Sequence, residues 1–171
     1  ARPPRGLIVS TGEDTPPGQS LRGRMLVLEA SPGDVPLARL TPHQDAAAAG
    51  LLAQALAGFV HWLAPQYGEL CARLPGERAE LRGRAQTGAG SARTPGVVAD
   101  LALGLKYALA CAVAAGALGE AERGELARRG WQALQRAAAA QAEHIGAAEP
   151  TALFLRRLIA ALASGRAHVA G

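Results

Sequence analysis

Hydroxyl and guanidinium side chains flank two short apolar runs near the start of the chain. Ser10 and Thr11 directly follow the first run, Leu7–Val9. Arg22 and Arg24 directly precede the second run. In α/β nucleotide-binding sheets, ligands lie beyond the carboxyl ends of parallel strands, so a hydroxyl there can orient water beside a γ-phosphate. An arginine near the next strand can stabilise the charge that develops in phosphoryl transfer. We therefore expect Thr11, Arg22 and Arg24 to be catalytic residues and Ser10 to contact a nucleotide.

Each of these residues also has a purely structural interpretation. Ser10 and Thr11 are polar residues that could simply end a strand, and Arg22 and Arg24 could be surface arginines. Arg93 follows a Gly-rich stretch and precedes a helix start. It is expected to reach a nucleotide or a nucleic acid, or to be a solvated loop residue.

The sequence lacks the motifs of a self-sufficient enzyme. It contains no Gly-x-x-x-x-Gly-Lys-[Ser/Thr] phosphate loop, no Gly-x-Ser-x-Gly elbow and no Cys/His nucleophile pair. Cys71 and Cys111 belong to no Cys-x-x-Cys or Cys/His cluster, so no metal site is predicted. We expect both to be buried free thiols of a cytosolic protein.

The composition favours packed helices. Of the 171 residues, 49% are hydrophobic but only 4% are aromatic, so the core must consist of Leu, Val and Ala, and Ala is the best helix former. The predicted fold is mainly α, a helical bundle of about five helices preceded by two short β-strands, Leu7–Val9 and Met25–Leu28. Two strands alone do not make a stable sheet, so these strands are expected to complete a larger one.

Periodicity and capping signals place the helices after about Leu40. Thr41 followed by Pro42 predicts a helix start, and the apolar spacing continues to Leu63. A helix from Tyr67 is expected to be interrupted at Pro75–Gly76 and to continue as a solvated helix. The remaining predicted helices span about 95–118, which is apolar nearly all round and therefore central, 120–145, which is amphipathic, and 150–164.

Charge and hydropathy give weaker indications. The net charge is +4, and Lys106 is the only lysine among 18 basic residues. Arginine forks suit phosphate binding, but a GC-rich genome produces the same bias. The apolar run Tyr107–Leu118 is shorter than the roughly 20 residues that a membrane span needs, and no signal-peptide pattern is present. We expect a soluble, cytoplasmic protein.

The order of these features resembles a known family. The segments Leu7–Glu13 and Pro17–Glu29 resemble the end of the ATPase core in phage- and plasmid-type primase-helicase proteins. These are AAA+ or RecA-like motor ATPases, often fused to a primase-polymerase domain. The resemblance extends more loosely to four downstream segments, Trp62–Ala64, Ser91–Pro95, Glu149–Leu155 and Ala163–His168.

The resemblance implies roles and partners for the chain. Thr11, with Ser10, would be the sensor residue that follows a core strand, and Arg22 or Arg24 would be the arginine finger. Residues 1–40 would end the ATPase core, and residues 41–171 would form a helical lid or oligomerisation subdomain. The Walker A and B segments are absent, so ATP and Mg are expected only in a longer parent protein. The implied partners are the rest of the ATPase core, further copies of the parent and DNA, with no membrane.

Two other functions remain open. The apolar helix 95–118 is compatible with a non-catalytic helical binding or oligomerisation module. Four arginines between 73 and 84 are compatible with a helical nucleic-acid-binding domain; they are Arg73, Arg78, Arg82 and Arg84.

Overall fold

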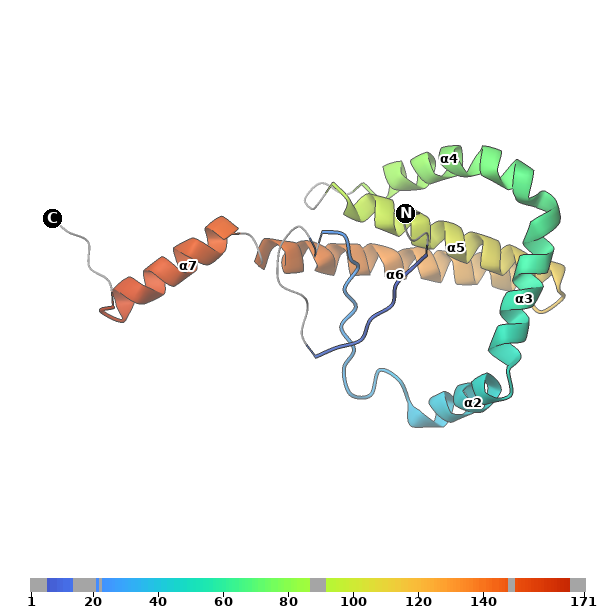
Figure 1. Cartoon of the computed structure of the whole chain (residues 1–171), viewed down its shortest axis with the longest axis horizontal. Coiled ribbons are helices and arrows are strands. Elements are labelled where there is room, and N and C mark those ends of the chain that lie inside the picture. The colour runs from blue at the N-terminus through green and yellow to red at the C-terminus, as the bar shows by residue number, and fades with distance from the viewer. Residues whose placement is uncertain (1–5, 14–20, 22, 87–91, 148–149, 167–171) are drawn as a thin grey trace, which may run out of the picture.

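The computed structural model describes residues 6–13, 21, 23–86, 92–147 and 150–166. Its elements are, in order, α2 (Leu37–Ala48), α3 (Leu51–Leu63), the short 3₁₀ helix η1 (Ala64–Gln66), α4 (Tyr67–Arg84), α5 (Thr94–Ala114), α6 (Glu120–Ala147) and α7 (Pro150–Ala163). The mainly helical prediction is therefore confirmed. Figure 1 shows α4, α5 and α6 side by side, with α2 and α3 curving away from one end and α7 projecting from the other.

Helix α5 is the centre of the fold because it packs between α4 and α6. Its apolar sequence has no polar face, and it contributes most of the buried side chains; among them are Val98, Ala99, Leu103, Tyr107 and Leu109. Small residues let α5 and α6 approach closely. A Cβ atom added to Gly130 of α6 would overlap the Cδ2 atom of Leu105 on α5.

Helix α4 contributes a leucine stripe to this core. Leu70 is buried against Leu103 and Tyr107 of α5, and Leu74 and Leu81 pack on the same cluster. Phe59, Trp62 and Leu63 reach the cluster from the C-terminal end of α3. The stripe explains why α4 continues through Pro75 without the expected interruption. Packing on both sides of the proline outweighs the one backbone hydrogen bond that it removes.

The predicted helix from Pro42 to Leu63 is in fact two helices. The first begins at Leu37, so Pro42 lies inside it and Thr41 is not its N-cap. The break falls at Gly50, whose φ of +76° lies in the left-handed region that favours glycine. As a result α2 leaves α3 at an angle, and neither helix has a buried residue.

Helices α5 and α7 both end next to a glycine with a positive φ. Helix α5 ends at Ala114, four residues before the expected end, at a turn with Gly116 at φ +72°. The Ala117 N–H donates to the Ala112 carbonyl and closes this turn (2.9 Å). Helix α7 ends before Gly165, which has φ +69°, as its sequence predicts.

The two predicted strands are not formed in the part of the chain that the structure describes. Residues 7–12 and 26–30 have no regular secondary structure. Leu7, Ile8 and Val9 are 77%, 82% and 81% exposed, so the first apolar run covers nothing. The expectation of two strands is wrong for this chain by itself, because neither run has a neighbouring strand to supply ladder hydrogen bonds.

The second apolar run lies instead against the core. Met25, Leu26 and Val27 are half-buried, and the Val27 N–H donates to Oε1 of Gln141 on α6 (3.0 Å). Gln141 is fully buried, at 0% exposure. A buried side-chain amide needs hydrogen-bond partners, so this bond fixes the segment beside the C-terminal half of α6.

Helix α5 is long and apolar enough to cross a membrane by length and composition, and the bent pair Leu37–Ala48 with Leu51–Arg84 passes the same test together. In the structure, α5 is flanked by α4 and α6, and its Asp100 and Lys106 form ion pairs with α4.

Candidate functional site

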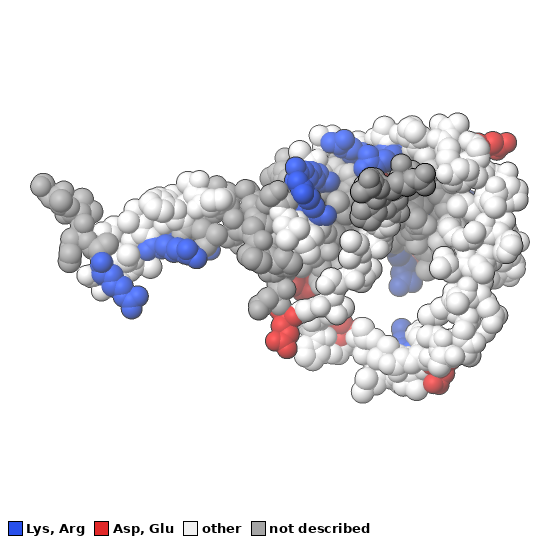
Figure 2. All heavy atoms as spheres, viewed as in Figure 1, with Lys and Arg blue, Asp and Glu red and all other residues white. Residues whose placement is uncertain are grey.

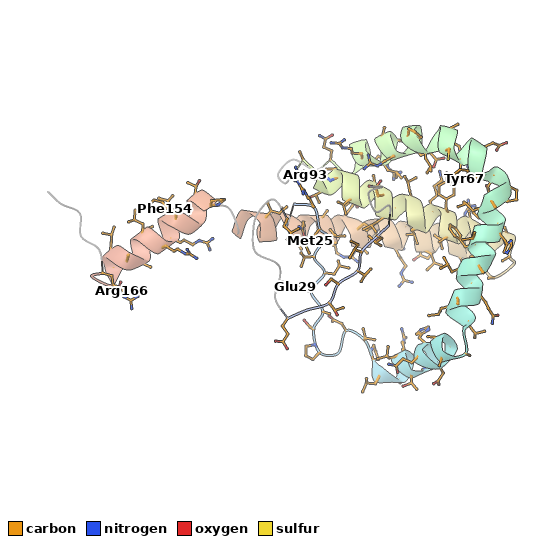
Figure 3. The ribbon with its side chains drawn as sticks, viewed as in Figure 1. Met25, Glu29, Tyr67, Arg93, Phe154 and Arg166 are labelled. Carbon is orange, nitrogen blue, oxygen red and sulfur yellow. The ribbon has the colours of Figure 1, made fainter. Side chains whose placement is uncertain are left out.

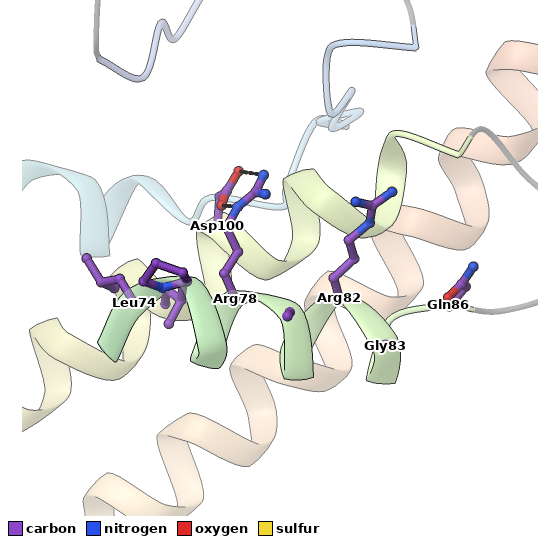
Figure 4. Close-up of a pocket in the computed structure, with 9 residues that line it drawn as sticks. Leu74, Arg78, Arg82, Gly83, Gln86 and Asp100 are labelled. Atoms are coloured by element: carbon purple, nitrogen blue, oxygen red, sulfur yellow. Dashed lines mark hydrogen bonds and ion pairs between the residues drawn. The ribbon is translucent and has the colours of Figure 1, made fainter. Parts of the chain in front are cut away.

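An open groove of about 640 Å³ runs between α4 and α5. Leu74, Pro75 and Leu103 form its apolar part, and Arg82, Gln86 and the pair Arg78–Asp100 form its polar part. Figure 4 shows Arg78 and Arg82 rising from successive turns of α4 toward α5. The groove therefore combines an apolar floor with charged walls.

Arg78 and Asp100 join the two walls of the groove. The Arg78 Nε and Nη2 atoms donate to the two carboxylate oxygens of Asp100, the second at 2.9 Å (Figure 4). The hydrogen bond and the negative charge of Asp100 raise the pKa of the Arg78 guanidinium. Both side chains are about half exposed, so this fork fixes the geometry of the groove more than it stabilises the fold.

Beyond this pair, cationic side chains gather at the end of the core where α4 ends and α5 begins. Arg82 Nη2 donates to the Ala92 carbonyl at 3.4 Å, so Arg82 and the neighbouring Arg93 lie together. Arg93 lies at this same end in Figure 3. We call Arg82 and Arg93 the basic end. Figure 2 shows blue side-chain atoms over this part of the molecule.

Helix termini contribute to the electrostatics of the basic end. Arg82 and Arg84 occupy the last turn of α4, where the helix dipole favours cations. Arg93 immediately precedes the first turn of α5, where the positive end of the helix dipole favours anions. An anion held near Arg93 would therefore meet both a guanidinium and the positive end of a helix.

A second groove, of about 390 Å³, lies between α4, α5 and α6. Arg84 stacks over the Trp131 ring with its Cζ atom 4.7 Å from the ring centroid. Lys106 and Arg128 line the same groove, but each forms an ion pair, with Glu77 and Glu125 respectively. The Arg84–Trp131 pair thus joins α4 to α6 as a cation–π contact.

Glu77 interacts with three polar or charged side chains of α4 and α5. Its carboxylate accepts a hydrogen bond from the Tyr107 hydroxyl (2.7 Å) and pairs with Lys106 (2.9 Å) and Arg73 (3.3 Å). Partial burial, the largest single influence, raises the pKa of Glu77, but the hydrogen bonds and charges of Tyr107, Lys106 and Arg73 together outweigh it and lower that pKa. The expectation of a merely solvated helix here is therefore wrong.

The predicted site residues do not form one site in the described part of the chain. Arg93 belongs to the basic end, and Arg24 is exposed in a turn before the segment that packs on α6. Ser10 and Thr11 are exposed in a segment without regular structure and do not line either groove. Arg22 lies outside the described residues. The sensor and finger assignments therefore stay predictions.

Both cysteines are free thiols in the structure. Cys71 is exposed and Cys111 is half-buried, so the expectation of buried thiols is wrong for Cys71. Among the described residues, no three His, Cys, Asp or Glu side chains are grouped closely enough to hold a metal ion.

Sequence reasoning missed the residues that organise the site. Glu77 lies on the same face of α4 as Leu70, Leu74 and Leu81, at spacings of seven, three and four residues. This spacing predicts that Glu77 lies at a helix interface. Asp100 interrupts an otherwise apolar helix, which was a second signal. No sequence signal identified Gln141, because its partner is a backbone N–H 114 residues away.

Comparisons with known proteins identify no family for this chain. No family model matches the chain, and neither curated proteins nor solved structures give a significant match.

Proposed function

We propose that the chain is the C-terminal part of a helicase-like ATPase that acts in DNA replication or on mobile elements. Residues 1–40 would complete the ATPase core, and residues 41–171 would form its helical lid. The observation that carries this proposal is the bare apolar run Leu7–Val9, more than three-quarters exposed and followed directly by Ser10 and Thr11. A wholly apolar run is typical of a strand that is covered on both faces, and the resemblance of residues 7–29 to an ATPase core supports the sheet of that core as the cover.

The arrangement of Arg24 agrees with a role in stabilising phosphate charge. Arg24 is exposed in a turn that is closed by its own N–H donating to the Leu21 carbonyl (2.9 Å). The following residues are fixed to the core by the Val27–Gln141 hydrogen bond. An anchored turn loses little backbone entropy when its side chain meets a phosphate, and the planar guanidinium fork of arginine suits the phosphate oxygens.

The residues of this chain fit the edge of a nucleotide site and not its centre. Bound ATP with Mg would supply the transferable γ-phosphate, and the remainder of the ATPase core would hold it. Thr11 would orient the attacking water, with Ser10 beside it. Arg22 or Arg24 would stabilise the charge that develops on the transferred group, and Arg93 would make a further phosphate contact.

The test is the rate of ATP hydrolysis by the full-length polypeptide. Replacing Arg24 with Ala should reduce turnover by about 10³-fold or more while nucleotide binding largely persists, because a finger acts on the transition state. Arg39→Ala is the matched control, since Arg39 is an exposed arginine on α2. Unchanged hydrolysis in the Arg24 variant would remove the assignment of this residue.

A second candidate function is nucleic-acid binding, which the clustering of Arg82 and Arg93 favours. Of the four arginines of α4, Arg73 and Arg78 already pair with carboxylates, so only Arg82 and Arg84 offer cations without a paired acid among the described contacts.

A salt titration of DNA binding tests this alternative. If the basic end contacts phosphates, Arg82→Gln should lower the slope of log K against log salt by about one, and Arg73→Gln should leave it unchanged. Absence of binding at low salt would exclude the function.

A further inference from the structure

The described part of the molecule exposes many large apolar side chains. Most of them belong to the first apolar run, to helix α3 and to helix α7. Apolar surface that is contiguous along one helix face is typical of a protein–protein interaction site.

One uncovered surface is an apolar stripe on α3. Leu52, Leu56 and Val60 recur every four residues and are 59%, 64% and 55% exposed. The neighbouring Phe59 and Leu63 face the core. Figure 2 shows that the arc formed by α2 and α3 stands off from the body of the molecule, with an opening beside it.

A second uncovered stripe follows the whole length of α7. Phe154, Leu155, Leu158, Ile159 and Leu162 lie on one side of this 14-residue helix, and between 37% and 64% of each is exposed. Figure 3 shows α7 projecting into solvent beyond the end of α6, with Phe154 away from the helical core. A short amphipathic helix is marginal in water without a surface to cover its apolar face.

The two stripes match each other but cannot meet within one chain. Helix α3 packs on the half of α5 that contains Tyr107, near the start of α6, whereas α7 leaves the far end of α6 (Figure 1). At about 1.5 Å per residue, the 28 residues of α6 span roughly 40 Å and the 14 residues of α7 only about 20 Å. Helix α7 folded back along α6 would stop about halfway to its own α3.

We propose that α7 of one copy packs on the exposed α3 stripe of a second copy, in a reciprocal exchange. When two copies lie antiparallel, the end of one α6 meets the start of the other, so each α7 reaches the partner copy's α3 and the exchange closes. Each α3–α7 contact then buries two leucine-rich stripes. The helices that carry these stripes are of nearly equal length, 13 and 14 residues.

Charge favours the same pairing. The described part of the chain from Pro150 onward carries Arg156, Arg157 and Arg166 and no acidic residue. Helix α3 contains no Asp, Glu, Lys or Arg, and the end of the molecule that holds it bears Glu69, Glu120 and Glu122 together with Arg123, which pairs with Glu120 (3.0 Å). Two α7 helices packed on each other would bring their arginines together, whereas α7 on α3 places them near carboxylates.

Light scattering of the whole 171-residue chain is the first test. We expect a mass of two chains, reduced to one chain by Leu158→Asp on α7 or by Leu56→Asp on α3. Ala160→Asp and Gln54→Asp lie about 200° round their helices from these sites and should leave the pair intact. Because all four positions are exposed, circular dichroism should show an unchanged helical content. A monomeric wild-type chain, or a pair insensitive to Leu158→Asp, would overturn the proposal.

Cross-linking identifies the contact itself. Both natural cysteines are first replaced, as Cys71→Ala and Cys111→Ala, and one sample then carries Leu56→Cys while a second, tagged sample carries Leu158→Cys. Oxidation of the mixture should yield a disulfide-linked heterodimer. With Ala160→Cys in place of Leu158→Cys it should not. Failure of the Leu56–Leu158 cross-link to form would also overturn the proposal, even if the chain is dimeric, because the pair would then use another surface.

Discussion

At the scale of single residues, the charged side chains between α4 and α5 explain why these helices keep one register. Glu77 reaches Lys106 and Tyr107 across the interface, and Arg78 reaches Asp100, nearly two turns earlier on α5. A sequence pattern reveals that Glu77 shares a face with leucines, but it does not reveal which residues of α5 lie opposite. That information depends on how far one helix slides along the other, which only packing decides.

Glu77→Gln should lower the free energy of unfolding by about 1–2 kcal/mol at neutral pH, because the Tyr107 hydroxyl loses a charged acceptor and Lys106 loses its ion pair. Chemical denaturation measures the change. Glu80→Gln, a change to another glutamate of α4 that is exposed, should stay within about 0.5 kcal/mol of the wild type.

The same substitution predicts a pH dependence. The pKa of Glu77 is lowered from 4.5 in the folded chain, so its stabilising effect is fully present above that value. The effect is lost as the pH falls through the folded pKa, since both states then bind the proton. The difference in stability between the wild type and Glu77→Gln should therefore shrink in acid. A difference that grows below pH 4.5 would contradict the assignment.

At the scale of elements, the sequence predicts the presence of the helices better than their limits. The apolar character of α5 correctly placed it at the centre, and Gly165 correctly ended α7. The division at Gly50 was not foreseen, because an isolated glycine is compatible with a continuous helix and only its φ of +76° makes it a break. Pro75 predicted an interruption that does not occur, because tertiary packing keeps α4 helical on both sides of the proline.

Two glycines of α6 provide a test of the close contact with α5. Gly124 has open space around it, so Gly124→Ala should raise the free energy of unfolding by about 0.5–1 kcal/mol through helix propensity. Gly130→Ala gains the same propensity but forces Leu105 to move, at a cost of about 1–3 kcal/mol. Thermal denaturation should therefore rank Gly130→Ala below Gly124→Ala. Equal stability of the two variants would show that α5 and α6 are more loosely packed.

At the scale of the whole molecule, the chain combines a three-helix core with three poorly covered parts: the first apolar run, the arc of α2 and α3, and α7. The proposed ATPase core would cover the first, and the proposed exchange between copies would cover the α3 stripe and α7. Sequence reasoning predicted that the two apolar runs are strands that complete a larger sheet, but neither run forms a strand in the described residues. It could not place Thr11 near Arg24, since that proximity would depend on a sheet that these residues do not form by themselves.

Hydrogen exchange at the Leu7, Ile8 and Val9 amides tests the central claim most directly. In the 171-residue chain these amides belong to an exposed segment and should exchange at the rates of an open chain. In the full-length polypeptide they should exchange at least about a hundredfold more slowly, because a strand inside a sheet opens only with its folding unit. Exchange that is equally fast in both would show that no sheet receives this run, and the assignment to an ATPase core would fail.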